Sequence, residues 1–180
     1  MDILAHGLWA GFGVVLLRRH RALAPGTALA AVALATLPDV VHLLPLVGWA
    51  ALGDGDWSAL RAYVLAMPGQ EPVLPPLVQS LSHHGHCLMH SAVVAGAATA
   101  LLWAWRRALW LPLLGWWSHI LIDVFTHSAR YYPVPVFYPF TDWAFDGIAW
   151  NQPWMLALNY AALGATAWWL HHTGWHRRAG

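Results

Sequence analysis

Three side chains of metal-binding type lie four residues apart in the stretch GWWSHILIDVFTHS, residues 115–128. His119, Asp123 and His127 interrupt a run that Trp, Ile, Leu, Val and Phe otherwise fill. Positions four apart drift by only about 40° around a helix of 3.6 residues per turn, so the three share one face. Imidazole and carboxylate groups along one face of an apolar helix indicate half of a metal site.

The same residue types recur near one end of three other apolar runs. The complete set of candidate metal ligands is His6, Asp39, His42, His84, His86, His90, His119 and Asp123. A carboxylate inside a membrane costs about 2.5–3.5 kcal/mol on insertion scales, so we expect Asp39 and Asp123 to be functional. The pattern leaves His83 and Cys87 undecided, and it places His127 near the surface, where water can satisfy its ring.

Two carboxylates and several imidazoles, with no cysteine cluster, suit Zn²⁺, and also Mn²⁺ or Fe²⁺. The number of donors is sufficient for one or two ions. A bound divalent ion lowers the pKa of water and stabilises the attacked and leaving oxygens of a phosphoester. A centre of this kind suits phosphoester hydrolysis, and Asp39 and Asp123 are then the candidates for the catalytic general base.

Composition indicates where such a site lies. Hydrophobic residues make up 59% of the 180-residue chain and charged residues only 9%, whereas soluble domains carry about 25% charged residues. This deficit predicts an integral membrane protein. The nine basic residues are all Arg and form no long block, so we expect no nucleic-acid partner. A single cysteine excludes an intrachain disulfide framework.

Five apolar runs approach the length of about 20 residues that a bilayer-crossing helix requires. They predict an all-α fold, with one membrane-embedded domain over residues 1–180 and about five transmembrane helices. The predicted spans are residues 3–17, 27–52, 88–105, 108–127 and 153–171. Residues 53–87, which include the amphipathic stretch WSALRAYVLAM, and residues 128–152 are expected to form interfacial loops or short helices.

The arginines orient this bundle. With five spans, one side of the membrane receives Arg18, Arg19, Arg21, Arg106, Arg107, Arg177 and Arg178. The other side receives only Arg61 and Arg130. The positive-inside rule then places the N-terminus outside and the C-terminus in the cytoplasm. In this orientation the candidate ligands share a level a little below the extracytoplasmic surface, and the cytoplasmic halves of their spans contain none.

The order of these motifs resembles that of a known family. A His at position 6, PD at 38–39, a His-rich run that ends in HS at 90–91, and SHxxxD at 118–123 resemble the LexA-regulated, YdjM-like family of membrane-bound, metal-dependent hydrolases. The resemblance covers residues 3–145 and includes the segment VPVFYPF. It implies a bacterial cytoplasmic (inner) membrane protein whose metal positions are His6, Asp39, His90, His119 and Asp123.

Two positions depart from the family pattern. The family's PD-x-D motif reads PDVV here, so Val41 replaces the second aspartate and His42 is the nearest substitute. The family's His-Arg-x-x-x-His-Ser motif lacks its Arg, and His84 or His86 takes the place of the first His. The His-x3-Asp pair is also similar, more weakly, to zinc phospholipases C.

The leading hypothesis is a membrane hydrolase that uses metal-activated water to cleave a phosphoester or ester of a lipid or lipid-linked substrate. The alternative is a metal-ion transporter or a metal-binding membrane protein without hydrolytic activity. A transporter needs donors along the whole depth of the bilayer. Two further alternatives are bis-His haem ligation, which leaves Asp39 and Asp123 unexplained, and a scaffold in which the polar residues only join helices.

Overall fold

A computed structural model describes residues 1–53 and 55–173 of the chain. The prediction of an all-α protein is confirmed, because the described residues form seven helices and no strand. The helices are α1 (Ile3–Arg18), α2 (Thr27–Leu52), α3 (Trp57–Val64), α4 (Pro76–Met89), α5 (Ala92–Arg106), α6 (Leu113–Thr126) and α7 (Pro153–His172). Arg177 and Arg178, which contribute to the predicted orientation, lie outside the described residues.

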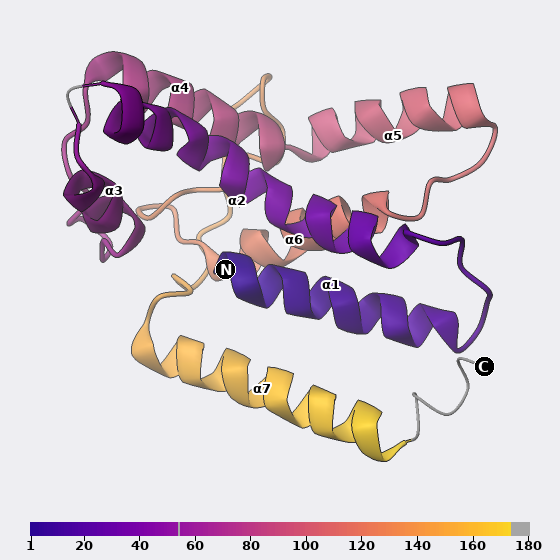
Figure 1. The fold of residues 1–180 in the computed structure, drawn as a ribbon. Coiled ribbons are helices and arrows are strands. Elements are labelled where there is room, and N and C mark those ends of the chain that lie inside the picture. Colours follow the sequence, from indigo (N-terminus) through magenta and orange to yellow (C-terminus); the bar gives the residue numbers. More distant parts are fainter. Residues whose placement is uncertain (54, 174–180) are drawn as a thin grey trace.

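Helix α2 is the centre of the arrangement and packs against α1, α4 and α6. Figure 1 shows the beginning of α1, the short helix α3 and the beginning of α7 toward one end of the molecule. The connection from α1 to α2 and the end of α7 lie toward the other end (Figure 1). Side chains from the first end of several helices can therefore meet at one level.

The structure supports fewer membrane spans than the sequence predicted. Among the described residues, only α2 is by itself long and apolar enough to cross a membrane. Helices α4 and α5 pass the same test only as a pair, and they are bent by 58° at the break between them. Helices α1 and α6 are apolar but shorter. Five transmembrane helices are thus not confirmed.

Two predicted spans have different boundaries in the structure. The span expected at 88–105 is α5 alone, which begins at Ala92, and it is preceded by α4 within the segment expected as an interfacial loop. The span expected at 108–127 begins only at Leu113, directly after Pro112. Proline is favoured at a helix start, which agrees with the start of α6 after Pro112. Helix α5 begins at Ala92 because the side chain of Ser91 caps its first turn. The amphipathic helix expected after residue 56 is present as α3.

The break between α4 and α5 is tied down by a loop from elsewhere in the chain. Ser91 begins α5, and its hydroxyl accepts two backbone N–H groups of the first turn. The same hydroxyl donates to the carbonyl of Tyr138 at 2.6 Å, and the N–H of Ala92 donates to the carbonyl of Val136 at 2.9 Å. His90 and Ser91 are both fully buried. The loop therefore fixes the position of His90 at the end of α4.

Helices α2 and α6 approach each other at a glycine. A Cβ atom on Gly115 would lie 2.0 Å from the carbonyl oxygen of Ala31, which is far inside contact distance. One turn further along both helices, His119 Nδ1 lies 2.7 Å from the carbonyl oxygen of Ala35. The next turn carries Asp39 on α2 and Asp123 on α6. Only a residue without a side chain at position 115 allows this register.

We expect Gly115→Ala to destabilise the fold because the added methyl group must push α6 away from α2. Overpacking of this kind typically costs about 1–3 kcal/mol. The control is Gly96→Ala on α5, where a Cβ atom meets nothing within 4 Å and alanine is the better helix former. Thermal unfolding in detergent, followed by circular dichroism, should show a lower midpoint for Gly115→Ala only. Equal midpoints for the two variants would contradict the close approach.

Candidate metal centre

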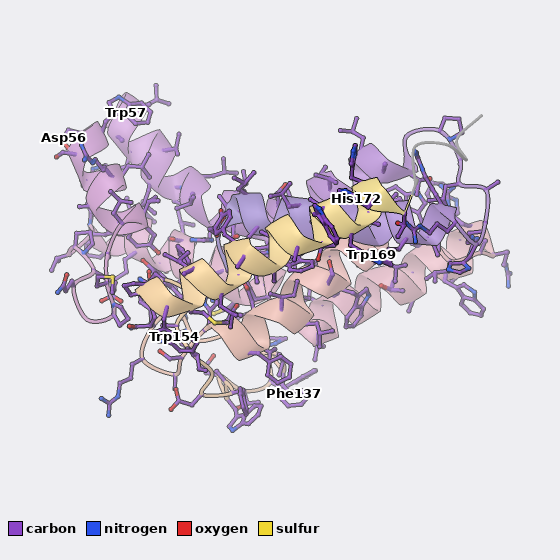
Figure 2. All side chains as sticks on the ribbon, turned by 90° about the horizontal axis from the view of Figure 1, so that it is seen from below. Asp56, Trp57, Phe137, Trp154, Trp169 and His172 are labelled. Carbon is purple, nitrogen blue, oxygen red and sulfur yellow. The ribbon has the colours of Figure 1, made fainter. Side chains whose placement is uncertain are left out.

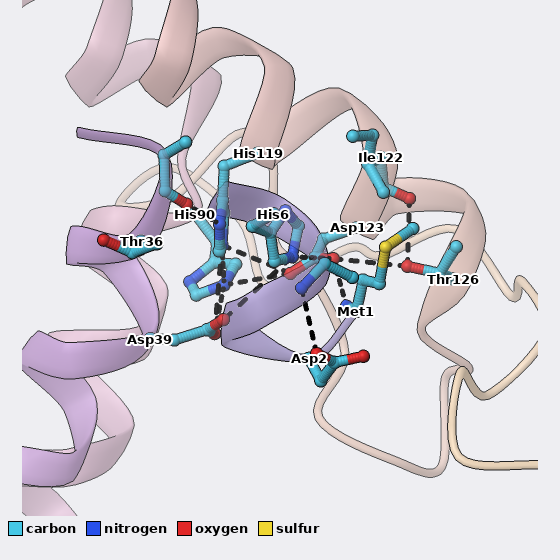
Figure 3. A network of polar contacts seen from close by, with 12 residues as sticks. Met1, Asp2, His6, Thr36, Asp39, His90, His119, Ile122, Asp123 and Thr126 are labelled. Carbon is cyan, nitrogen blue, oxygen red and sulfur yellow. Dashed lines mark hydrogen bonds and ion pairs between the residues drawn. The ribbon is translucent and has the colours of Figure 1, made fainter. Parts of the chain in front are cut away.

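Four of the predicted ligands form one buried cluster. Asp39 comes from α2, His90 from the break between α4 and α5, and His119 and Asp123 from α6. Each offers one ligand atom, and the four atoms all lie within 4.8 Å of one another. A group of this kind could hold a metal ion. Figure 3 shows His6 of α1 beside the same cluster.

Asp123 lies at the middle of the cluster and is itself fully buried. Its Oδ1 is 2.9 Å from His6 Nε2. Its Oδ2 lies 3.2 Å from His119 Nε2, 3.3 Å from His127 Nε2 and 3.4 Å from His90 Nε2. The other carboxylate, Asp39, lies 3.8–4.0 Å from the rings of His6, His90 and His119. Two carboxylates thus face four imidazoles that come from different parts of the chain.

Hydrogen bonds to the backbone determine which ring nitrogen of these histidines carries the proton. The Nδ1 atoms of three rings each face a carbonyl oxygen, from His90 to His86 at 2.8 Å, from His119 to Ala35 at 2.7 Å and from His127 to Tyr132 at 2.7 Å. A carbonyl oxygen only accepts, so Nδ1 must donate. In a neutral ring, Nε2 is then left with its lone pair.

This assignment makes the centre of the cluster a group of acceptors. The Nε2 atoms of His90 and His119 lie 2.9 Å apart, and neither carries a proton in the neutral ring. The carboxylate oxygens of Asp39 and Asp123 around them also only accept. Acceptors buried this closely are unfavourable unless a cation or extra protons lie among them. Donation of Nδ1–H to a carbonyl is also the usual support of a metal-binding histidine.

The amino group of Met1 lies at the same acceptors. It contacts Asp123 Oδ1 and lies 3.1 Å from His127 Nε2. Asp2 fixes the beginning of α1 beside it, because its carboxylate accepts the N–H of Ala5 at 3.0 Å and the hydroxyl of Tyr160 at 2.9 Å.

Three predicted ligands lie outside the cluster. His84 is exposed, and its Nδ1 lies 3.0 Å from the hydroxyl of Tyr138. It is two residues from His86, so it points to another side of α4. His86 is buried but stacks on the ring of His90 and bonds to the carbonyl of Pro133 at 2.9 Å. His42 packs against His86, with ring centres 5.5 Å apart. His42 and His86 therefore surround the cluster and help to position His90.

The prediction that His127 lies near the surface is wrong. The residue is only 5% exposed, and its ring points at Asp123. The chain returns over the end of α6, where the N–H of Gly147 donates to the carbonyl of His127 at 2.9 Å and that of Trp150 to the carbonyl of Thr126 at 2.8 Å. The spacing of four residues from Asp123 was the sequence signal that could have placed His127 among the residues of the cluster. Cys87 contacts the exposed His83, away from the cluster.

A cavity of about 300 Å³ lies beside the cluster. Its walls include Asp39 and His127, and also Tyr63 of α3 and Tyr132 of the loop after α6. Its size lies at the lower end of the range for small-molecule sites. Burial, followed by the neighbouring Tyr63, raises the pKa of Tyr132 well above its ordinary value. The tyrosine hydroxyl at this cavity therefore keeps its proton and can donate it in a hydrogen bond.

Removal of one cluster ligand should remove bound metal. We expect the detergent-purified protein to contain a divalent ion. His119→Ala and Asp123→Ala should bind this ion more than tenfold more weakly, because each variant lacks one of the buried metal ligands. His84→Ala is the matched control, since His84 lies outside the cluster. Elemental analysis by plasma mass spectrometry measures the content of each. Unchanged metal in His119→Ala and Asp123→Ala would rule out this centre.

Comparisons with known proteins identify no relative of this chain. No family model matches it, and no curated protein and no solved structure shows a significant match. The resemblance in motif order to membrane-bound, metal-dependent hydrolases therefore remains a prediction. What the structure itself contributes is the buried cluster of Asp39, His90, His119 and Asp123, which could hold a metal ion.

Proposed function

We propose that this protein is a membrane-bound, metal-dependent hydrolase that cleaves a phosphoester or ester of a lipid or lipid-linked substrate. The observation that carries the proposal is the group of buried acceptors beside a cavity, since a cation there has both donors to hold it and space for a substrate. Histidine and carboxylate donors without cysteine favour Zn²⁺, with Mn²⁺ or Fe²⁺ as the next choices.

The two aspartates have different surroundings, which suggests different roles. Asp123 faces four imidazoles and has no exposed surface, so it suits the binding of the ion. Asp39 lines the cavity, whereas Asp123 does not. When bound, a divalent ion supplies positive charge that favours ionised water and stabilises the oxygens of the ester. Asp39 is then placed to take the proton of the attacking water.

An apolar groove lies next to the cavity, which supports a substrate with a hydrocarbon chain. The groove lies between α1, α2 and α7, encloses about 960 Å³ and shares Ile3 and Leu4 with the cavity. Gly7 and Gly11 of α1 are among the residues that line it. Because α1 has 16 residues, the groove follows a helix of about 24 Å. A polar group at the cluster and a chain in the groove describe an amphiphile.

The surface of the helices supports a location in a membrane. Large apolar side chains such as Leu29 and Leu44 of α2 and Leu121 of α6 are 55–76% exposed. In Figure 2, Trp57 and Trp154 lie toward one end of the molecule and Trp169 toward the other. Tryptophan is enriched at both membrane interfaces. We propose that the end with the cluster faces the extracytoplasmic side of a bacterial inner membrane.

Hydrolysis of lipid phosphoesters by the purified, metal-loaded protein tests the proposal. We expect turnover on at least one member of a panel of phospholipids and polyprenyl phosphates, and a loss of about 10²–10⁴-fold in Asp39→Asn, because an amide cannot take a proton. His84→Ala should retain the activity of the unchanged protein. Metal-dependent uptake into proteoliposomes without any hydrolysis would instead favour the transporter.

The groove makes a separate prediction about chain length. Gly11→Leu should fill it, since the nearest atom to a Cβ there is Val32 Cγ2 at 3.9 Å. We expect a loss of at least tenfold in kcat/KM for a long-chain substrate, with little change for a short, water-soluble phosphodiester. Gly96→Leu on α5, which does not line the groove, is the control. An equal loss for both substrates would mean that the substitution disturbs the site itself.

A further inference from the structure

Tyr132 has an unusual backbone conformation beside the cluster. Its φ angle is +46°, a left-handed value that a bulky residue rarely adopts. Two histidines hold the chain at this point, because His127 donates to the carbonyl of Tyr132 at 2.7 Å and His86 bonds to the carbonyl of Pro133 at 2.9 Å. Backbone strain of this kind persists only where the surroundings impose it, and it is concentrated at functional sites.

The hydroxyl of Tyr132 is buried and has no hydrogen-bond partner. The adjacent Tyr131 shows how such a group is normally satisfied, because its hydroxyl donates to the carbonyl of Ala66 at 2.9 Å. Tyr63 lies next to Tyr132, with ring centres 5.4 Å apart, and its hydroxyl approaches that of Tyr132 without reaching the distance and angle of a full hydrogen bond. A buried donor left unpaired is unfavourable, so its partner is to be sought among molecules that enter the site.

Both tyrosines line the cavity that also contains Asp39 and His127. The Tyr132 ring lies 6.2 Å from the ring of His42, centre to centre, on the side of the cluster that faces this cavity. The two tyrosines also line a second cavity of about 280 Å³. The two tyrosines therefore belong to the walls of both cavities beside the cluster.

We propose that the hydroxyls of Tyr132 and Tyr63 form a subsite for one non-bridging phosphoryl oxygen of the substrate. The inference rests on the proposed function, in which the phosphorus atom lies at the metal cluster. Phenol hydroxyls are neutral donors, and an anionic oxygen is the acceptor to which they bond most strongly. The carboxylates and imidazoles of the cluster are acceptors that suit the cation, and the tyrosine hydroxyls offer donors for the anion from another part of the cavity wall.

The subsite explains the conformation of residue 132 as well as its hydroxyl. The histidines that bond to the carbonyls of residues 132 and 133 belong to the cluster and its support. The same two bonds that hold His127 and His86 in place thus also fix the backbone at Tyr132, whose side chain lines the cavity. The binding of a cation and the placement of an anion donor are parts of one arrangement.

Binding of inorganic phosphate to the metal-loaded protein tests the subsite without any reaction. Isothermal titration calorimetry should show that Tyr132→Phe weakens phosphate binding about tenfold or more, at unchanged metal content, because only a charge-assisted hydrogen bond is lost. Tyr63→Phe should weaken it in the same direction. Tyr138→Phe is the matched control, since that hydroxyl meets His84 and lines neither cavity.

The outcomes separate the subsite from the proposed function. An unchanged phosphate Kd in both Tyr132→Phe and Tyr63→Phe, or no phosphate binding by the metal-loaded protein, would overturn the subsite even if lipid phosphoesters are cleaved. Weakened binding in these variants supports the subsite even if no member of the substrate panel is hydrolysed, a result that would refute the proposed function alone.

Discussion

The burial of Asp123 among four imidazole rings is the interaction on which the rest of the site depends. A carboxylate away from water is stable only with compensating positive charge or hydrogen-bond donors. Backbone carbonyls bind the Nδ1 protons of three of these rings, so in their neutral form they offer Asp123 only lone pairs. A cation among these atoms would interact favourably with both the carboxylate and the lone pairs. The metal ligands are held in place by segments from several parts of the chain.

Much of this site could be predicted from the sequence. The apolar surroundings made Asp39 and Asp123 conspicuous, and the spacing of four placed His119 on the same face as Asp123. In the structure, Asp39, Asp123 and His119 lie together with His90 and His6. Such inferences succeed because helical periodicity and the cost of a buried charge are local properties of the chain, which a sequence states directly.

The parts that failed depend on contacts between distant segments. The burial of His127 results from residues 147–150 returning over the end of α6, and no periodic pattern announces such a return. The bend before α5 depends on a loop beyond residue 133 that bonds to Ser91 and Ala92. The sequence also treated the His-rich run as one set of ligands. On α4 a difference of two residues separates His84, which is exposed, from His86, which lies under His90.

The donors of the cluster are drawn from nearly the whole described chain, since His6 lies in the first helix and His127 follows the sixth. No single helix hairpin contains enough of them, so the site is complete only when segments distant in sequence have already met. An ion that binds only the complete site binds the folded state and not the unfolded state. Its binding free energy therefore adds to the free energy of unfolding of the whole fold. The bound ion would then cross-link segments that are distant in the sequence. Its loss would lower the stability even of helices that carry no ligand.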